Sequence, residues 1–380
     1  MTINTYVLTG FIHADEPLAT CSKDLKDREG KDKPTPIPYQ ASSNGLVYYF
    51  PSSGIRGSLR RAAASVILDK TIERTGDPKP FSLDEHYAMV LGGVKGSEVM
   101  DRIGITLVEE WLSKNPMLSV FGAGDGGILG FVEGKLSVGS AYCEPGVEPT
   151  IFSGARTDEF YRNPGRVKYL SDEDIELLVG RSVANSISSK VKKEIEALEA
   201  EIRKLSRSKE SADIERLAEL KAELVAKEEK RKKDLESAGA KTVGVGMPLA
   251  GYKAIPRGEK LEHTIKLFRA NSVEMGLLLA SLQRFALEPL LGAHAANGLG
   301  TVSGQWNVRK VNQSGSTVIG SVKFDAFDNL VIEGDELVQA LADFNAFVET
   351  GPADFTIPSM QRKGRAKAGD AIDTEAQAEG

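Results

Sequence analysis

The chain has 380 residues, enough for one large domain or two ordinary ones, which excludes a peptide or a disulfide-stapled scaffold. Apolar residues make up 41% and charged residues 27%, so wholesale disorder and a fibrous class are excluded as well. With 48 basic and 54 acidic side chains the net charge is -6, which argues against a protein that coats duplex DNA by bulk attraction. A local basic groove remains compatible with this charge.

Nothing in the sequence predicts a membrane or redox function. The longest apolar run, residues 275–282, is far shorter than the ~20 residues of a membrane span, so no membrane partner is expected. The N-terminus lacks the pattern of a signal peptide, and a cytoplasmic protein is expected. Two cysteines, Cys21 and Cys143, cannot form a zinc site alone and are predicted to be free thiols. No cofactor and no metal are predicted.

In chain order, the apolar periodicity predicts strands and helices mixed, which favours an α+β fold. Strands are expected at residues 7–12, 46–50, 127–142, 261–269 and 301–311. Helices are expected at residues 54–70 and 272–287. From Ser359 onward the residues are small and polar without an apolar period, so a disordered tail is predicted for 359–380.

Between Lys190 and Glu236 the composition changes to 14 basic and 13 acidic side chains in 47 residues. Within this stretch Val191, Ile195, Leu198, Ile202 and Leu205 alternate at spacings of four and three, which is the seam of a coiled coil. A weaker second apolar stripe follows a polar stretch at 206–213. The pattern predicts a helical-hairpin arm over 190–236, and one long solvated helix is the alternative.

Motifs for familiar chemistries are weak or missing. Residues 122–127 formally satisfy the dinucleotide-binding pattern GxGxxG, but a strand-like stretch follows instead of a helix, so a glycine-rich turn is the better interpretation. The four histidines are scattered at positions 13, 86, 263 and 294. Neither metal-dependent nor triad hydrolysis is predicted.

The stretch Phe50 to Arg61 has the pattern of a phosphate-binding helix start. A strand runs into a serine-glycine turn and then into an apolar helix, where Ser52 and Ser53 can cap the free amides. Arg56 and Arg60 are four residues apart and therefore lie on one helix face, with Arg61 beside them. The alternative is a set of arginines on a solvated helix face.

This motif, Pro-Ser-Ser-Gly-Ile-Arg-Gly followed by Leu-Arg, resembles the signature of the RAMP superfamily, the RNA-binding proteins of CRISPR effector complexes. Residues 153–162 and 252–267 look like the segments that enter and leave the family's thumb, and residues 292–302 are similar to its C-terminal glycine-rich loop. The resemblance covers about residues 3 to 312. It implies a ferredoxin-like (RRM-like) palm formed by 1–152 and 253–358, with a thumb insertion at 153–252 that contains the arm.

Within the superfamily the chain looks most like the backbone subunit, the "Cas seven" type, and most like its type IV version. The resemblance implies guide-RNA (crRNA) binding by a subunit that polymerises along the guide in a helical filament and presents it for base pairing with a target nucleic acid. It also implies partner subunits: a guide-processing endonuclease, a RAMP subunit on the 5'-handle, a large or small subunit and a helicase. No nuclease activity of its own is expected.

The implied RNA-binding residues fall into three groups. The first is the helix start, with Ser52, Ser53, Gly54, Arg56, Arg60 and Arg61. The second interleaves basic and aromatic residues on the thumb, namely Arg156, Tyr161, Arg162, Arg166, Lys168 and Tyr169. The third is the glycine-rich loop, with His294, Asn297, Gly298 and Gly300, where glycines let backbone amides approach RNA. Ordinary turn chemistry explains the same glycines equally well.

Two alternative functions remain. In type III relatives a loop aspartate cleaves target RNA, and here Asp15, Asp24, Asp27 and Asp32 lie in the corresponding loop, none of them in a matching frame. Alternatively, the chain is an interaction scaffold whose coiled-coil arm carries the function.

Overall fold

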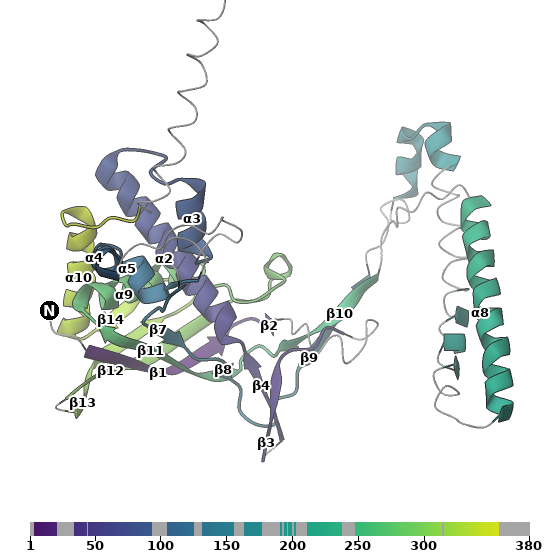
Figure 1. Cartoon of the computed structure of the whole chain (residues 1–380), viewed down its shortest axis with the longest axis horizontal. Coiled ribbons are helices and arrows are strands. Elements are labelled where there is room, and N and C mark those ends of the chain that lie inside the picture. Colours follow the sequence, from purple (N-terminus) through teal and green to yellow (C-terminus); the bar gives the residue numbers. More distant parts are fainter. Residues whose placement is uncertain are drawn as a thin grey trace, which may run out of the picture. The chain divides into compact units, whose positions relative to one another are not determined.

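A computed structural model was used for the whole chain (Figure 1). It describes residues 4–20, 34–43, 45–92, 105–124, 131–155, 163–176, 191, 194–195, 197–199, 201–202, 211–237, 248–313 and 315–356. The chain divides into two compact units, the first formed by Met1–Phe152 with Gly251–Gly380 and the second by Ser153–Ala250. Among the described residues, no helix is both long and apolar enough to cross a membrane. The predicted disordered tail and Cys21 lie outside the described residues.

The first unit contains a large antiparallel sheet. Its strands follow the order β14-β13-β12-β1-β11-β8-β4-β3, and β7 also pairs with β11. The central strands are β1 (Asn4–Ala14), β11 (Lys260–Ala270), β12 (Val302–Asn312) and β13 (Gly315–Phe324). Shorter strands complete it: β3 (Tyr39–Ser42), β4 (Gly45–Phe50), β7 (Leu136–Val138), β8 (Ala141–Tyr142) and β14 (Val331–Glu333).

Helices cover one face of this sheet (Figure 1). The main ones are α2 (Ser52–Thr75), α9 (Ser272–Leu287) and α10 (Asp335–Glu349), accompanied by α3 (Leu83–Val90), α4 (Ile105–Lys114) and α5 (Pro116–Phe121). Alternate residues of β1 such as Tyr6, Leu8 and Ile12 are buried under them, whereas Thr9 is exposed. The sheet therefore has a covered face and an open face, and the α+β class is as predicted.

Local sequence explains where the two long predicted helices begin and end. Helix α9 spans the predicted residues 272–287 because Asn271 and Glu274 form a reciprocal capping box at its start. Helix α2 runs further than the predicted 54–70 and ends where Gly76 adopts the left-handed conformation, with φ 69°.

Helix α10 was not predicted from the sequence, although it packs directly on α9. Their contact is so close that a Cβ on Gly276 would lie 2.0 Å from the carbonyl oxygen of Ala340. Only glycine permits this approach of the two backbones. The small residue in α9 thus has a packing role that is visible only once its partner helix is known.

Two small sheets and the second unit complete the described chain. Strands β5 (Ala123–Gly124) and β6 (Phe131–Val132) pair, as do β2 (Leu18–Ala19), β10 (Pro248–Ile255) and β9 (Thr150–Ala155) in the order β2-β10-β9. The second unit contains the 3-10 helix η1 (Pro164–Tyr169) and α8 (Ser211–Ser237). In the predicted arm, Lys227 of α8 forms a 2.6 Å ion pair with Glu194 of the first predicted helix. Coiled-coil packing of the arm stays a prediction.

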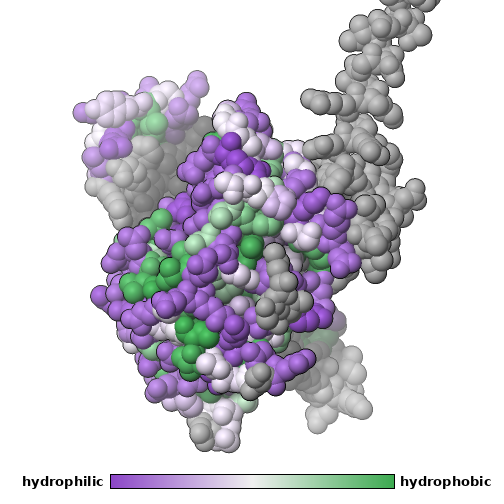
Figure 2. Space-filling model, turned by 90° about the vertical axis from the view of Figure 1, so that its left-hand side faces the viewer, coloured by the Kyte–Doolittle hydropathy of each residue, from purple (hydrophilic) through white to green (hydrophobic). Residues whose placement is uncertain are grey.

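Several apolar side chains remain exposed at the β13–β14 edge of the first unit and beside it, among them Val318, Phe327, Val331 and Val338. Figure 2 shows one side of the molecule, where hydrophobic residues gather in small patches separated by hydrophilic ones. Such dispersed exposure is ordinary for a folded surface and does not by itself mark an interface.

A buried histidine, His263, forms two hydrogen bonds near the centre of the sheet. The Trp306 indole N–H donates to Nδ1 of His263 (3.2 Å), so Nε2 of His263 carries the proton that it donates to the Gly139 carbonyl (3.1 Å). The two side chains meet because the residue between them in the register is Gly10, which has no side chain. Burial lowers the pKa of His263 to about 4.

This histidine predicts an acid-sensitive fold. The unfolded chain takes up a proton at His263 below pH 6.5, whereas the folded chain does so only near pH 4. Folding stability therefore decreases as the pH is lowered from 6.5 to 4. Between pH 7 and pH 5 the loss is about 2 kcal/mol. Denaturant unfolding of the wild type and of His263→Gln, which keeps a donor and an acceptor without titrating, measures it. An equal pH dependence in both proteins would contradict the prediction.

Candidate nucleic-acid interface

The predicted serines do not cap the start of α2. The residue that precedes the helix is Pro51, which makes no side-chain capping hydrogen bond. The amide of Ser52 donates to the hydroxyl of Ser140, at 3.1 Å, and is therefore not free for an anion. The predicted capping by Ser52 and Ser53 is thus corrected. Ser53 and Gly54 are exposed and form the accessible surface of the first turn.

Arg60 points into the protein. Its side chain is buried, at 6% exposure, and its guanidinium donates to the carbonyls of Ala88, Met89, Phe121 and Gly122 at 2.6–3.0 Å. Burial, followed by the charge of Arg56, lowers the pKa of Arg60 to about 10. The predicted phosphate contact of Arg60 is corrected because this guanidinium is bonded to the interior of the unit.

Arg56 lies on the same helix face, as its spacing from Arg60 predicts, and contacts the same group. Its guanidinium donates to the Phe121 carbonyl at 2.8 Å, and burial lowers the pKa of Arg56. Phe121 is the last residue of α5, where helix carbonyls lack partners within the helix. Two arginines of α2 therefore cap the end of α5, and the face that carries them is turned inward.

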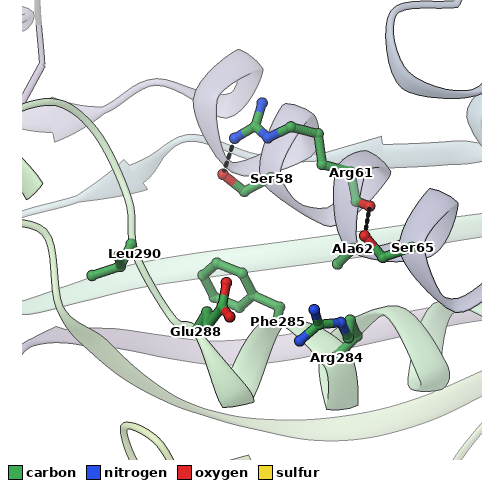
Figure 3. Close-up of a pocket in the computed structure, with 8 residues that line it drawn as sticks. All are labelled: Ser58, Arg61, Ala62, Ser65, Arg284, Phe285, Glu288 and Leu290. Carbon is green, nitrogen blue, oxygen red and sulfur yellow. Dashed lines mark hydrogen bonds between the residues drawn. The ribbon is translucent and has the colours of Figure 1, made fainter. Parts of the chain in front are cut away.

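Arg61 is the outward-facing arginine of the motif. It is exposed, donates to the Ser58 hydroxyl at 2.9 Å, and lies over Gly57, where a Cβ would be 3.5 Å from its guanidinium. Its neighbour across a pocket of about 210 Å³ is Arg284, from the last turn of α9 (Figure 3). Arg284 has no hydrogen-bond or ion-pair partner among the described residues.

The pocket between α2 and α9 has a cationic and a hydroxyl-bearing lining. Ser58, Ala62 and Ser65 come from α2, while Phe285, Glu288 and Leu290 come from α9 and the loop that follows (Figure 3). Two guanidinium groups against one carboxylate leave a formal charge of +1. No sequence pattern singled out Arg284, because its position becomes meaningful only when α9 packs against α2.

The glycine-rich loop packs against the start of α2 through one buried ring. A Cβ on Gly54 would lie 2.8 Å from the Phe50 ring, and a Cβ on Gly292 would lie 3.1 Å from the same ring. Phe50 is 1% exposed and is therefore held between the two glycines. Two motifs more than 230 residues apart in the sequence thus lie side by side.

Within this loop the glycine amides serve the fold. Gly300 is buried, has φ 97°, and donates its amide to the Pro17 carbonyl, while the amide of exposed Gly298 donates to Ala295 at the end of the 3-10 helix η2 (Ala295–Asn297). The prediction that these two amides approach RNA is corrected in favour of turn chemistry. Asn297 is exposed at the surface of the loop.

His294 ends a column of three aromatic rings. Phe152 stacks on Tyr252 with centroids 5.5 Å apart and planes 12° apart, and Tyr252 stacks on His294 at 3.8 Å and 11°. His294 is exposed and has φ 66°, a conformation uncommon for a residue with a side chain. The loop thus holds this imidazole flat on Tyr252 at the protein surface.

The remaining predicted residues are only partly described. On η1, Arg166 and Lys168 are exposed, and the Lys168 ammonium lies 5.1 Å from the ring centroid of Tyr169, which is 78% exposed. Asp15 accepts from Ser303 at 3.1 Å and lies 2.8 Å from Nδ1 of His13. Outside the described residues lie Arg156, Tyr161, Arg162, Asp24, Asp27 and Asp32.

Comparisons with known proteins give only distant similarities. No family model matches the chain, and no curated protein matches it. Among solved structures, Csm3 of Methanopyrus kandleri has a TM-score of 0.34 and 11% identity, covering 83% of this chain and 79% of that one. Csc2 of Thermofilum pendens has a TM-score of 0.30 and 10% identity, covering 89% and 71%. Scores this low support no functional argument, so function has to be inferred from the residues of this chain.

The division between inward and outward arginines predicts unequal losses of folding stability. Arg60→Ala leaves four buried carbonyls without their charged donor and should lower the free energy of unfolding by about 4 kcal/mol. Arg61→Ala, one residue away on the exposed side, should change it by less than about 1 kcal/mol. Urea unfolding of both variants tests this, and equal small losses would contradict the buried role of Arg60.

Proposed function

We propose that this chain binds single-stranded guide RNA as a repeating backbone subunit of a CRISPR ribonucleoprotein. The observation that carries the proposal is the meeting of two sequence motifs at Phe50. Both the helix start and the glycine-rich loop belong to the resemblance with the RAMP superfamily, and each places a glycine against the same Phe50 ring. A scaffold without RNA binding would not require this meeting.

On this surface the guide backbone is held by Arg61 and Arg284. Both arginines line the pocket between α2 and α9, and exposed Gly54 adds no side chain to the first turn of α2. A phosphate can therefore approach the helix closely and accept charge-assisted hydrogen bonds from either arginine. Such contacts position the strand without reading its sequence, and base pairing supplies the specificity.

His294 provides the second kind of contact. The imidazole is already stacked on Tyr252, so a nucleobase placed on its outer face extends the column by one ring without reorganising the loop. Every base has a flat face, so this contact tolerates any sequence. On the second unit, Tyr169 beside Lys168 has the same combination of ring and cation.

The strand order supports the part of the proposal that concerns the palm. A ferredoxin-like palm needs the order β12-β1-β11-β7, with α2 between β1 and β7 and α9 between β11 and β12, and the sheet is compatible with it. In this proposal the second unit is the thumb, the subunit is of type IV, and further copies and effector subunits assemble on the same guide. Target destruction is left to partners. Asp15 is engaged by His13 and Ser303, and no group of three or more metal-ligating side chains occurs among the described residues.

The phosphate contact predicts a change in salt dependence. Arg61→Ala should weaken binding of a labelled single-stranded RNA roughly tenfold and reduce the slope of log affinity against log salt by about 0.7, as expected for one lost contact. The control is Lys79→Ala, which removes one exposed positive charge beyond the other end of α2. Fluorescence anisotropy from 50 to 300 mM salt measures both. Equal effects of the two variants would contradict the proposal.

The stacking contact predicts a loss of RNA affinity that does not depend on the salt concentration. His294→Asn removes the ring but keeps a residue that tolerates the left-handed backbone, so the loop conformation is preserved. We expect RNA affinity to fall about fivefold with an unchanged salt slope, since a base contact releases no counterions. Unchanged affinity would remove His294 from the interface, and a reduced slope would assign it to a phosphate instead.

A further inference from the structure

The open face of the sheet carries a row of side chains that no sequence motif announced. The strand register places one residue from each of six strands side by side: Tyr49, Tyr142, Glu262, Phe11, Gln305 and Lys323. Because directly paired residues of an antiparallel sheet point to the same face, these side chains share the face opposite the helices. The candidate guide contacts of α2 are on the other side of the same sheet.

A pocket of about 440 Å³ lies in this row, a size in the range of small-ligand sites. Its rings are Phe11 and Tyr142, its charged groups are Lys260 and Glu262, and its hydroxyls include Thr9 and Thr264. Gly10 and Gly139, which have no side chains, also line it. The pocket thus combines aromatic surface with polar groups that can meet the edge of a ligand.

The position of the two rings suits a flat ligand. Phe11 and Tyr142 both pair with Glu262, one from each side, so their backbones lie two inter-strand spacings, or about 9.6 Å, apart. Because the Glu262 side chain stands in the row between them, a planar base stacks on one of the two rings at a van der Waals contact of ~3.5–4 Å. A ligand held in this way presents its edge to the Glu262 carboxylate.

The charged side chains of the pocket determine which flat ligands can bind. Glu262 is exposed and has no hydrogen-bond or ion-pair partner among the described residues, so its carboxylate is available as an acceptor. The Lys260 ammonium lies 4.0 Å from the Phe11 ring centroid and can move to an acceptor atom or a phosphate of the ligand. Lys266 and Arg309 add positive charge on the same face, in the row through Val7.

We propose that this pocket binds a nucleobase that bears an exocyclic amino group, within a single-stranded nucleic acid that crosses the open face of the sheet. Cytosine fits these groups: its amino group donates to Glu262, and its ring acceptors face Lys260 and the threonine hydroxyls. Uracil has the same size but presents a carbonyl where cytosine has the amino group, and that oxygen faces the carboxylate unfavourably. This site is distinct from the guide contacts at Arg61.

The test compares two matched hexaribonucleotides, C6 and U6, by fluorescence anisotropy with the full-length protein. The wild type should bind C6 about fivefold more tightly than U6. Glu262→Gln should bring the ratio close to one, because an amide can donate to the uracil carbonyl as well as accept from the cytosine amino group. Equal affinities in the wild type, or a ratio that Glu262→Gln leaves unchanged, would overturn the proposal.

A control separates this proposal from the proposed guide contact. Arg61→Ala should weaken both hexamers equally and leave their ratio intact, because it acts on phosphates. Loss of the ratio in Arg61→Ala would place the base discrimination at the α2 surface and overturn the open-face site. The open face could instead bind a second copy of the chain, and sedimentation velocity without RNA tests this. If the wild type self-associates and Tyr142→Ala does not, the face is a contact between copies and the proposal is wrong.

Discussion

The candidate interface depends on how the Arg60 guanidinium satisfies carbonyls inside the first unit. Those carbonyls belong to α3, to the last residue of α5 and to Gly122 directly after it, so one side chain fixes α2 against both shorter helices. A helix that is fixed in rotation presents a defined outer face. Because Arg60 points inward, Arg61, one residue and about 100° further round the helix, points outward. The same local sequence therefore supplies the anchor and the exposed cation.

This arrangement explains why neighbouring arginines of one motif have different roles. The desolvation of a charged group is costly unless hydrogen bonds replace water, and the carbonyls around Arg60 and Arg56 provide that replacement. The inward pair also brings two like charges together, which the partly negative end of α5 tolerates. An exposed cation such as Arg61 carries no such cost and, apart from the donor that binds Ser58, keeps its donors for a ligand. Burial thus separates the structural arginines of this helix from the one that is exposed, and composition alone does not show which arginine is which.

The strands and the long helices could be predicted because their signals are local. The alternation of buried and exposed residues in β1 and the capping box formed by Asn271 and Glu274 each depend on residues close together in the sequence. The direction of an arginine side chain is not local. The spacing of Arg56 and Arg60 correctly predicts a shared face, but whether that face is covered depends on Phe121, which is 61 residues from Arg60. Arg284, the Phe50 contact between Gly54 and Gly292, and the aromatic row of the open face all arise from pairings across the chain, which no single segment encodes.

The small number of cations at the α2–α9 pocket has a consequence for affinity in the proposed function. A chain with a net charge of -6 repels a polyanion at long range, and at this pocket Arg61 and Arg284 oppose that repulsion within a Debye length of about 10 Å. On this proposal one copy grips only a short stretch of RNA there. Several copies on one strand do not share this weakness, because each bound copy gives the next an effective concentration far above its concentration in solution. Under the proposed function, such repetition favours a long guide over random short RNA, so the weak grip of a single copy becomes a source of selectivity for the proposed assembly.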